Sequence, residues 1–208
     1  MTSRVIITHD DMTCHDYPEQ MGRWTPDARG RLQQAALELF VEQGFAATTV
    51  PQITGRAGLT PRTFFRHFAD KREVFFDGDQ IPQLARRMLE QAPPDLDAMT
   101  LLRRGLRQVG VERFDGHRAE VRRRRDVILA EPALRERDTQ KRDDLVQVIR
   151  PALVARGVDP LGAALLAETT VAVLHVALES WLADPVDRAF GDVSDECFRR
   201  LFPTSTPA

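Results

Sequence analysis

The side chains best suited to recognising a charged or hydrogen-bonding partner gather in two short runs, residues 60–67 and 122–125. The first run is Thr-Pro-Arg-Thr-Phe-Phe-Arg-His, and the second is four consecutive arginines. A guanidinium group donates two parallel hydrogen bonds to a carboxylate, a phosphate or the O6 and N7 atoms of a guanine. The chemistry that these runs indicate is therefore recognition of anions and base edges, in which no bond is broken.

The arginine run lies on a predicted helix, and its place on that helix bears on its role. Val121 and Ile128 are seven residues apart and share an apolar stripe, so Arg124 and Arg125 fill the steps of three and four residues between them. At least one of these arginines must lie near the core-facing side. One interpretation is a solvated face with ion pairs, for example to Glu120. The other is that Arg124 or Arg125 receives the anionic group of a ligand.

His175 raises the question of catalysis. It lies four residues before Glu179 on one face of a predicted helix, with His117 as a possible third member of a metal site or a base. A single histidine on an apolar helix is more often a hydrogen-bonded core or interface residue, and the chain has no HExxH, GxSxG or phosphate-binding glycine loop. We therefore predict no catalytic residue and no metal site, and we assign His175 to ligand binding.

Composition narrows the class of protein. The chain has 208 residues, 42% of them hydrophobic, which is enough for a buried core. Cys14 and Cys197 form no CxxC pair, so neither a disulfide framework nor a zinc site is expected. The most apolar stretch, 161–182, contains Glu168, His175 and Glu179, and the first residues lack the features of a signal peptide. These patterns predict no membrane span and a cytoplasmic location.

Charge is unevenly distributed along the chain. Residues 1–21 hold one arginine and four acidic residues, residues 22–73 hold eight Lys or Arg against five Asp or Glu, and the remainder holds 20 against 22. A modestly basic segment between acidic ones permits contact with nucleic acid, because phosphate binding needs only a local patch of cations. Residues 1–21 show no helical or strand periodicity, and we predict a flexible tail there.

The elements that must position these side chains are helices. Thr25 can cap a first helix, with Pro26 in its first turn and Gly44 at its end. Apolar residues recur along it at steps of three and four, at Ala28, Leu32, Ala35, Ala36, Leu39 and Phe40. One face of this helix is therefore expected to be core.

Two short helices follow. Thr49 can cap residues 50–57, Thr60 with Pro61 marks a helix to about His67, and Gly58 lies in the turn between them. This arrangement is a helix-turn-helix, whose second helix places its first turn in the major groove of DNA. Apolar spacing packs the pair together through Val50, Ile53, Ala57, Leu59, Phe64 and Phe68. The side chains left pointing outward are Arg62, Thr63, Phe65, Arg66 and His67.

The rest of the chain is also predicted to be helical. Asp70 and Glu73 form a capping-box-like pair that predicts a long connecting helix running towards Pro93. Further helices are expected at about 97–114, 116–130, 132–156, 160–183 and 194–202, separated by glycine and proline breaks. No alternating β-branched run is long enough for a strand. The predicted fold class is all-α.

Residues 31–75 resemble the DNA-binding domain of the TetR family of transcriptional regulators. The matching residues are Ala-Ala-Leu-Glu-Leu-Phe at 35–40, Gly44-Phe45, Thr48-Thr49-Val50, Ile53, Ala57-Gly58-Leu59, Thr63 through Phe68, and Asp70-Lys71. The resemblance implies a homodimer that binds double-stranded operator DNA. It implies phosphate contacts for Thr49, Thr63 and Lys71, and groove-facing positions for Pro61, Arg62, Phe65 and His67.

Two residues depart from that family pattern. Phe65 stands where members usually carry a tyrosine whose hydroxyl meets a phosphate, so that hydrogen bond must be absent. Pro51 occupies a position where other members can offer a polar side chain to DNA. Base recognition is therefore expected to depend more heavily on the helix that begins at Pro61.

Residues 125–135, Arg-Asp-Val-Ile-Leu-Ala-Glu-Pro-Ala-Leu-Arg, resemble a TetR subgroup that includes the mycofactocin-system regulators. That resemblance implies an acyl-coenzyme A or a similar long apolar effector, which suits an apolar cavity with a basic mouth. We assign effector binding to Arg124, Arg125 and His175, and expect no resident cofactor. The predicted domains are a tail at 1–21, a three-helix helix-turn-helix domain at 22–75, and a helical bundle for ligand binding and dimerisation at 76–203.

The helix expected at 160–183 is apolar on nearly every side. Such a helix must be buried on more than one face, so one face should meet the core and another a second subunit. The family resemblance implies the same pairing. Two recognition helices would then lie about 34 to 36 Å apart, which predicts a palindromic operator.

The sequence thus predicts a ligand-released repressor, with repression resting on the resemblance alone. A helical enzyme and a protein-interaction module without DNA binding are the alternatives. We also expect ligand binding to move the helix that begins at Asp70 and so to respace the two DNA-binding domains.

Overall fold

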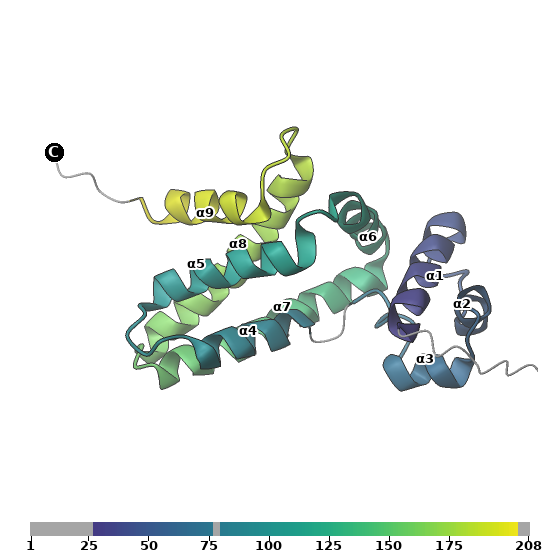
Figure 1. The fold of residues 1–208 in the computed structure, drawn as a ribbon, viewed down its shortest axis with the longest axis horizontal. Helices are drawn as coiled ribbons and strands as arrows, with labels where there is room; N and C mark the ends of the chain where they lie inside the picture. Colours follow the sequence, from purple (N-terminus) through teal and green to yellow (C-terminus); the bar gives the residue numbers. More distant parts are fainter. Residues whose placement is uncertain (1–26, 77–79, 204–208) are drawn as a thin grey trace, which may run out of the picture.

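The computed structural model describes residues 27–76 and 80–203, and within these ranges every regular element is helical. The elements are α1 (Ala28–Gln43), α2 (Val50–Ala57), α3 (Pro61–His67), α4 (Gln80–Gln91), α5 (Ala98–Val109), the π-helical segment η1 (Gly110–Phe114), α6 (Arg118–Ala130), α7 (Pro132–Ala155), α8 (Pro160–Ala183) and α9 (Phe190–Leu201). Figure 1 shows an elongated molecule with α1, α2 and α3 at one end. The all-α prediction is confirmed for these residues.

The end of the molecule formed by residues 27–76, here called the head, has its own core. Leu32, Ile53 and Phe64, one from each of its three helices, have no solvent exposure. The ring of Phe40 lies 4.7 Å from that of Phe75 in a tilted arrangement, so residues after α3 also contribute to this core. The packing predicted from the apolar spacing of the helix-turn-helix is confirmed.

The start of α1 lies two residues later than predicted. Thr25 and Pro26 are outside the described residues, and the cap is Asp27, whose carboxylate accepts a hydrogen bond from the Gly30 amide at 2.8 Å. An aspartate at this position satisfies an amide that has no partner within the helix. The end of the helix at Gln43, with Gly44 as its cap at φ 83°, agrees with the prediction.

The long helix predicted from Asp70 is wrong. Turns occupy residues 71–76, and the next helix, α4, begins at Gln80. The reason is that three consecutive apolar residues, Val74, Phe75 and Phe76, are all buried, whereas a helix would distribute them over more than half of its circumference. Only half of the capping box forms: the Asp70 carboxylate accepts from the Glu73 amide at 3.1 Å, whereas the Glu73 carboxylate pairs with Arg137 of α7.

Helices α4 to α9 form a second bundle, here called the body. α8 packs between α7 and α9, and its buried residues include Ala163, Val173 and Trp181. By length and composition alone α8 could cross a membrane. Its inner face lies in the core of the body, and the other side leaves Leu161 70%, Leu165 60% and Val176 57% exposed. The burial of one face in the core agrees with the prediction, and the second partner, another subunit, stays a prediction.

The head and the body share part of one core. Ile128 near the end of α6 and Leu134 in the first turn of α7 belong to the hydrophobic cluster of the head, and Leu134 has no solvent exposure. The ion pair from Glu73 to Arg137, with Lys141 at 3.6 Å from the same carboxylate, lies beside this contact. The corner between α6 and α7 therefore fixes the head to the body (Figure 1).

Candidate nucleic-acid interface and effector cavity

The turn between α2 and α3 is built by caps that the sequence predicted. Thr49 and Gln52 form a full capping box at the start of α2, and the Thr60 hydroxyl accepts from the Thr63 amide at the start of α3. Gly58 ends α2 at φ 63°, and a Cβ atom there would lie 2.9 Å from Arg31 Nη2. The turn therefore needs glycine for its backbone conformation, whereas a Cβ atom would displace only the end of the Arg31 side chain.

The outer face of α3 presents cations and an aromatic ring. Pro61, Arg62, Phe65 and Arg66 are exposed, and Phe65 has 59% of its surface accessible while its ring packs edge-on against the buried Phe64. Because Phe64 and Phe68 hold the opposite face in the core, the first turn of α3 is fixed in orientation. This geometry can place Arg62 against base edges in a groove.

Lys71 lies where it stabilises the turn between α1 and α2. Its Nζ donates to the carbonyls of Phe45 and Thr48, both at 2.7 Å, and lies 4.1 Å from the centre of the Phe45 ring. Burial lowers the pKa of Lys71. Since an ammonium group has three donors, one is left for the phosphate contact predicted from the family resemblance.

The hydroxyl of Thr49 is also engaged within the protein. It donates to Gln52 Oε1 at 3.0 Å and accepts from the Gln52 amide at 3.4 Å, while the side chain remains exposed. Lys71 and the buried Thr48 hold the turn that carries Thr49. The phosphate contacts of Thr49 and Thr63 remain predictions, and the structure places both residues at helix starts, where amide groups favour anions.

His67 is placed differently from the expectation that it faces the groove. Its Nε2 atom is buried and has no hydrogen-bond partner among the described residues. Burial, followed by the positive charges of Arg66 and Arg29, lowers the pKa of His67. In this rotamer the ring packs against the protein, so a contact between Nε2 and a base requires the side chain to rotate.

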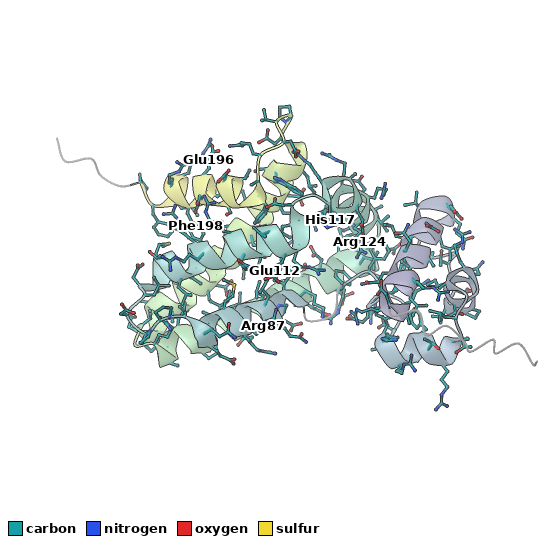
Figure 2. All side chains as sticks on the ribbon, in the orientation of Figure 1. Arg87, Glu112, His117, Arg124, Glu196 and Phe198 are labelled. Carbon is teal, nitrogen blue, oxygen red and sulfur yellow. The ribbon has the colours of Figure 1, made fainter. Side chains whose placement is uncertain are left out.

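A cavity of about 910 Å³ lies between the head and the body. Its walls come from α1 and the end of α2 on one side, and from η1, α6, α7 and α8 on the other. Arg124, Arg125 and His175, the three residues that the sequence assigned to effector binding, all line it. Figure 2 shows Arg124 on α6, at the end of the body nearest to α1.

Arg125 is the arginine of the run that lies on the core-facing side. Its side chain is 10% exposed, its Nη1 lies 2.9 Å from Asp138, and its Nε lies 2.5 Å from Glu179. Asp138 also accepts from Arg142 at 2.7 Å. These ion pairs join α6, α7 and α8, so Arg125 holds the wall of the cavity together.

His175 lies next to this cluster. Its Nδ1 atom is buried without a hydrogen-bond partner within the described part of the chain. Burial, with the positive charges of Arg142 and Arg125 added, lowers the pKa of His175 to about 4, although Asp138 acts in the opposite direction. The imidazole is therefore neutral at pH 7 and can exchange a hydrogen bond with a ligand in the cavity.

The polar groups that might have supported a metal site have other roles. Glu179, four residues after His175, forms its ion pair with Arg125. Over residues 27–76 and 80–203, no three His, Cys, Asp or Glu side chains lie close enough together to hold a metal ion. The sequence alternative of a metal-assisted enzyme gains no support from this arrangement.

An apolar slot adjoins the cavity. It has a volume of about 40 Å³, is lined by residues of α4, α5, α7 and α8, and shares Ile81 and Leu174 with the larger space. Arg124 stands on the wall of the larger space and pairs with Glu120 at 2.9 Å, which is the ion pair that the solvated-face interpretation expected. The combination is an apolar slot that opens on a charged cavity.

Three residues of the cavity were missed by sequence reasoning. Arg29 of α1 lines the head side of the same cavity, Arg113 of η1 lines the body side with Arg124, and Asp138 is the carboxylate that orders the arginine cluster. The spacing of Asp138 and Arg142 by four residues was a readable signal for an ion pair on α7. No local signal placed Arg29 or Arg113 beside Arg124, because they meet only through the packing of the head on the body.

Two family models match the chain in separate regions. The model described as bacterial regulatory proteins, tetR family, matches residues 32–77, and the model described as MftR C-terminal domain matches residues 96–205. The first match covers α2 and α3 with most of α1, and the second covers all elements from α5 to α9.

Curated relatives match shorter parts. The chain is 56% identical to the HTH-type transcriptional regulator TcmR of Streptomyces glaucescens over 46 residues, which is 22% of this chain and 20% of TcmR. It is 31% identical over 121 residues to a proposed mycofactocin biosynthesis transcriptional regulator, MftR of Mycobacterium tuberculosis, covering 57% of this chain and 60% of that protein. The matched segments thus span less than two thirds of these relatives.

Solved structures resemble the chain over more of its length. The SmeT–triclosan complex matches with a TM-score of 0.55 at 20% identity and covers 87% of this chain and 97% of SmeT. FadR from Bacillus subtilis in complex with stearoyl-CoA matches with a TM-score of 0.52 at 14% identity, covering 84% of this chain and 97% of FadR. At these identities the likeness concerns the fold.

Proposed function

Because the chain belongs to the TetR family of bacterial regulatory proteins, with a C-terminal domain of the MftR kind, we propose that it is a sequence-specific DNA-binding transcriptional regulator controlled by a small molecule. The observation that carries the proposal is the exposed first turn of α3, in which Arg62 lies outward on a helix held by the buried Phe64. Such a helix can enter a major groove. Acting on operator DNA places the protein in the cytoplasm.

Arg62 is the residue that we assign to base recognition. Its guanidinium can take O6 and N7 of one guanine together, and Pro61 and Phe65 flank it on the exposed face of α3. Thr49, Thr63 and Lys71 would fix the register of the head on the phosphate backbone. Since Phe65 lacks a hydroxyl, it can offer only apolar contact, for example to a thymine methyl group.

The proposed regulator acts as a homodimer through α8. Its exposed apolar residues Leu161, Leu165 and Val176 recur on the side of α8 that faces away from the body. An unpartnered apolar helix face of this kind favours a twofold contact, in which the same surface serves both subunits. A dimer would present two α3 helices to one side of the duplex and would require a palindromic operator.

The proposed effector has an apolar chain and an anionic head, as an acyl thioester of coenzyme A has. The apolar slot suits the chain and the arginine-bearing cavity suits the head, and one structural neighbour, FadR, is a complex with stearoyl-CoA. The slot, at about 40 Å³, holds little more than the roughly 30 Å³ share of one water molecule. An acyl chain must therefore move α4 away from α5, α7 and α8.

This movement supplies the proposed coupling. The sequence predicted that a helix beginning at Asp70 would transmit the movement, but no helix begins there. We propose that two other elements transmit it. They are α4, which lines the slot, and the α6–α7 corner, whose Ile128 and Leu134 enter the core of the head. A ligand that binds one arrangement better than the other shifts the population of dimers with the correct head spacing. We propose release of DNA, and hence repression without effector.

Arg62→Ala tests the proposed function. With DNA from upstream of the gene, the change should weaken operator binding by about 1 to 3 kcal/mol and relax specificity at one base pair. Arg123→Ala, which removes an exposed arginine from α6, is the matched control and should leave the affinity unchanged. An enzyme or a protein-interaction module would form no salt-sensitive, sequence-specific complex. An identical footprint and affinity for Arg62→Ala would refute the assignment.

A further inference from the structure

Three arginines from three different elements line the cavity between the head and the body. Arg29 comes from the first turn of α1, Arg113 from η1 and Arg124 from α6. Arg113 and Arg124 lie on consecutive elements of the body, and only the contact of the head with the body brings Arg29 to the same cavity. The effector residues assigned so far, Arg124, Arg125 and His175, all belong to the body.

The positive charges in this group are close enough to oppose one another. Arg113 is half-buried, and its pKa is lowered first by burial and then by the charges of Arg124 and Arg29. Glu120 acts against this effect and also pairs with Arg124 at 2.9 Å. Cations held together beside an open volume are stabilised when an anion enters between them.

The local structure explains why Arg113 faces the cavity. η1 is closed by a hydrogen bond from the Asp115 amide to the Gly110 carbonyl at 2.9 Å, which adds a residue to the helical turn. The neighbouring Phe114 is fixed in the core, with its ring 4.8 Å from Phe190. π-Helical turns are rare and are frequently found at functional sites.

Arg29 connects the cavity to the recognition helix. Its guanidinium lies 4.6 Å from the centre of the Phe68 ring, and its Nη1 donates to the His67 carbonyl across 3.4 Å. The Nε atom is buried and has no hydrogen-bond partner among the described residues. Arg29 thus contacts the end of α3 through one long hydrogen bond and one ring, and it retains a donor to offer to a ligand.

We propose that Arg29, Arg113 and Arg124 form a binding site for a phosphate or pyrophosphate group, through which the ligand contacts the DNA-binding head directly. A single carboxylate carries one charge and two oxygens, whereas three guanidinium groups match an anion with several of each. The bound anion attracts Arg29 away from Phe68 and the His67 carbonyl, and so loosens the end of α3. This inference rests on the proposed effector control and extends it to a residue of the head.

Calorimetry on the full chain without DNA tests the site. The probes are inorganic pyrophosphate, coenzyme A and a fatty acid, which carries a carboxylate in place of phosphates. We expect pyrophosphate or coenzyme A to bind, with affinity falling at least tenfold in Arg29→Gln and in Arg113→Gln, and unchanged in Arg123→Gln, whose arginine is exposed on α6 outside the cavity wall. Binding of pyrophosphate identifies a free anion as sufficient, and binding of coenzyme A alone identifies a nucleotide-bearing ligand.

Several results would overturn the site. The site is contradicted if neither pyrophosphate nor coenzyme A binds the wild-type protein. It is also contradicted if Arg29→Gln and Arg113→Gln both bind these probes as tightly as the wild type does. A fatty acid that binds with the same dependence on Arg29 and Arg113 would also contradict a phosphate site. Arg29→Lys, which keeps the charge, provides a second variant if Arg29→Gln does not fold. The calorimetry contains no DNA, so its result does not depend on operator binding. A protein that failed to bind an operator would contradict the proposed function, but the measured anion binding would still hold.

Discussion

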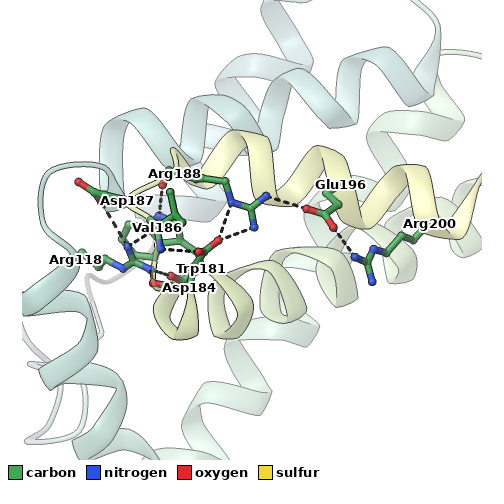
Figure 3. A network of polar contacts seen from close by, with 8 residues as sticks. All are labelled: Arg118, Trp181, Asp184, Val186, Asp187, Arg188, Glu196 and Arg200. Carbon is green, nitrogen blue, oxygen red and sulfur yellow. Dashed lines mark hydrogen bonds and ion pairs between the residues drawn. The ribbon is translucent and has the colours of Figure 1, made fainter.

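Two groups of arginines, at opposite sides of α6, show how their partners determine their role. At the C-terminal end of α8, Arg118 donates to the carbonyls of Trp181, Asp184 and Val186 (Figure 3). In the cavity, Arg29, Arg113 and Arg124 lie close to one another beside an open volume. The first group meets the negative end of a helix dipole, whereas in the second group Arg113 has Arg29 and Arg124 as neighbouring charges, although Arg124 also pairs with Glu120.

The first group extends into a continuous network. Asp184 pairs with Arg188, which pairs with Glu196, which in turn pairs with Arg200 (Figure 3). Each guanidinium in this chain of contacts has a carboxylate or a carbonyl as a partner, so the network ties α6 and α9 to the end of α8. The difference teaches that an arginine-rich sequence does not by itself indicate a binding site, whereas crowded cations on a cavity wall do.

The largest expected effect on stability comes from Arg125, which lines the cavity and yet is fully paired. Arg125→Ala should lower the free energy of unfolding by about 3 to 5 kcal/mol, because it removes one partner of a buried ion-pair cluster and leaves Asp138 and Glu179 without it. Denaturant unfolding followed by circular dichroism measures the change. If the free energy of unfolding fell by less than about 1 kcal/mol, Arg125 would not be a structural residue and would be grouped with Arg29, Arg113 and Arg124 of the cavity.

His175, which lies beside the paired Arg125 cluster, should make the stability of the protein depend on pH. Its folded pKa of about 4 lies below the ordinary value of 6.5, so the unfolded chain takes up a proton first, and stability is lost as pH falls from about 6.5 towards 4. The contribution is roughly 3 kcal/mol, since one pKa unit corresponds to 1.36 kcal/mol. The quantity to measure is the difference in unfolding free energy between the wild type and His175→Leu at pH 7 and pH 4. An equal difference at both values would contradict the lowered pKa of His175.

The helix-end group should show a smaller effect. Arg118→Ala should lower the free energy of unfolding by about 2 kcal/mol, because charged hydrogen bonds to three carbonyls at the end of α8 are lost. Arg118→Lys should recover only part of this loss, since an ammonium group cannot span the same carbonyls as a planar fork. Thermal melts of both variants provide the measurement. Equal melting temperatures for Arg118→Ala and the wild type would remove the structural role of this group.

The crowded group should show the smallest effect on stability. Arg113→Gln should change the free energy of unfolding by less than about 0.5 kcal/mol, because relief of repulsion from Arg124 and Arg29 offsets the contacts that are lost. Urea unfolding without ligand measures this. A loss as large as that of Arg118→Ala would show that Arg113 is structural, and the contrast between the two groups would disappear.

Local signals predicted most of the fold. Caps at Thr49, Thr60 and Asp97, and glycine or proline breaks between helices, lie within a few residues of the elements that they delimit. Two boundaries failed where tertiary packing decides. Residues 71–76 form turns because Val74 to Phe76 all enter the core of the head, and α9 begins at Phe190, four residues earlier than predicted, where that ring packs against Phe114.

The candidate site was predictable where it depends on one helix. Helical periodicity alone predicted the outward face of α3 and a core-facing place for at least one of Arg124 and Arg125, which in the structure is Arg125. Periodicity could not predict three other features, because each depends on how separate elements pack. These features are the buried Nε2 atom of His67, the carbonyls that accept from Lys71, and the proximity of Arg29 to Arg113. Sequence reasoning therefore identified the exposed face of α3 that we propose to contact DNA, and only part of the cavity behind it.

Selection of bound sites from random double-stranded DNA by the purified full chain tests the central claim most directly. The account predicts enrichment of one palindromic sequence with half-sites one helical turn apart, bound by a dimer with an affinity that falls steeply as salt is raised. A monomeric protein that enriches no sequence at moderate salt would contradict it.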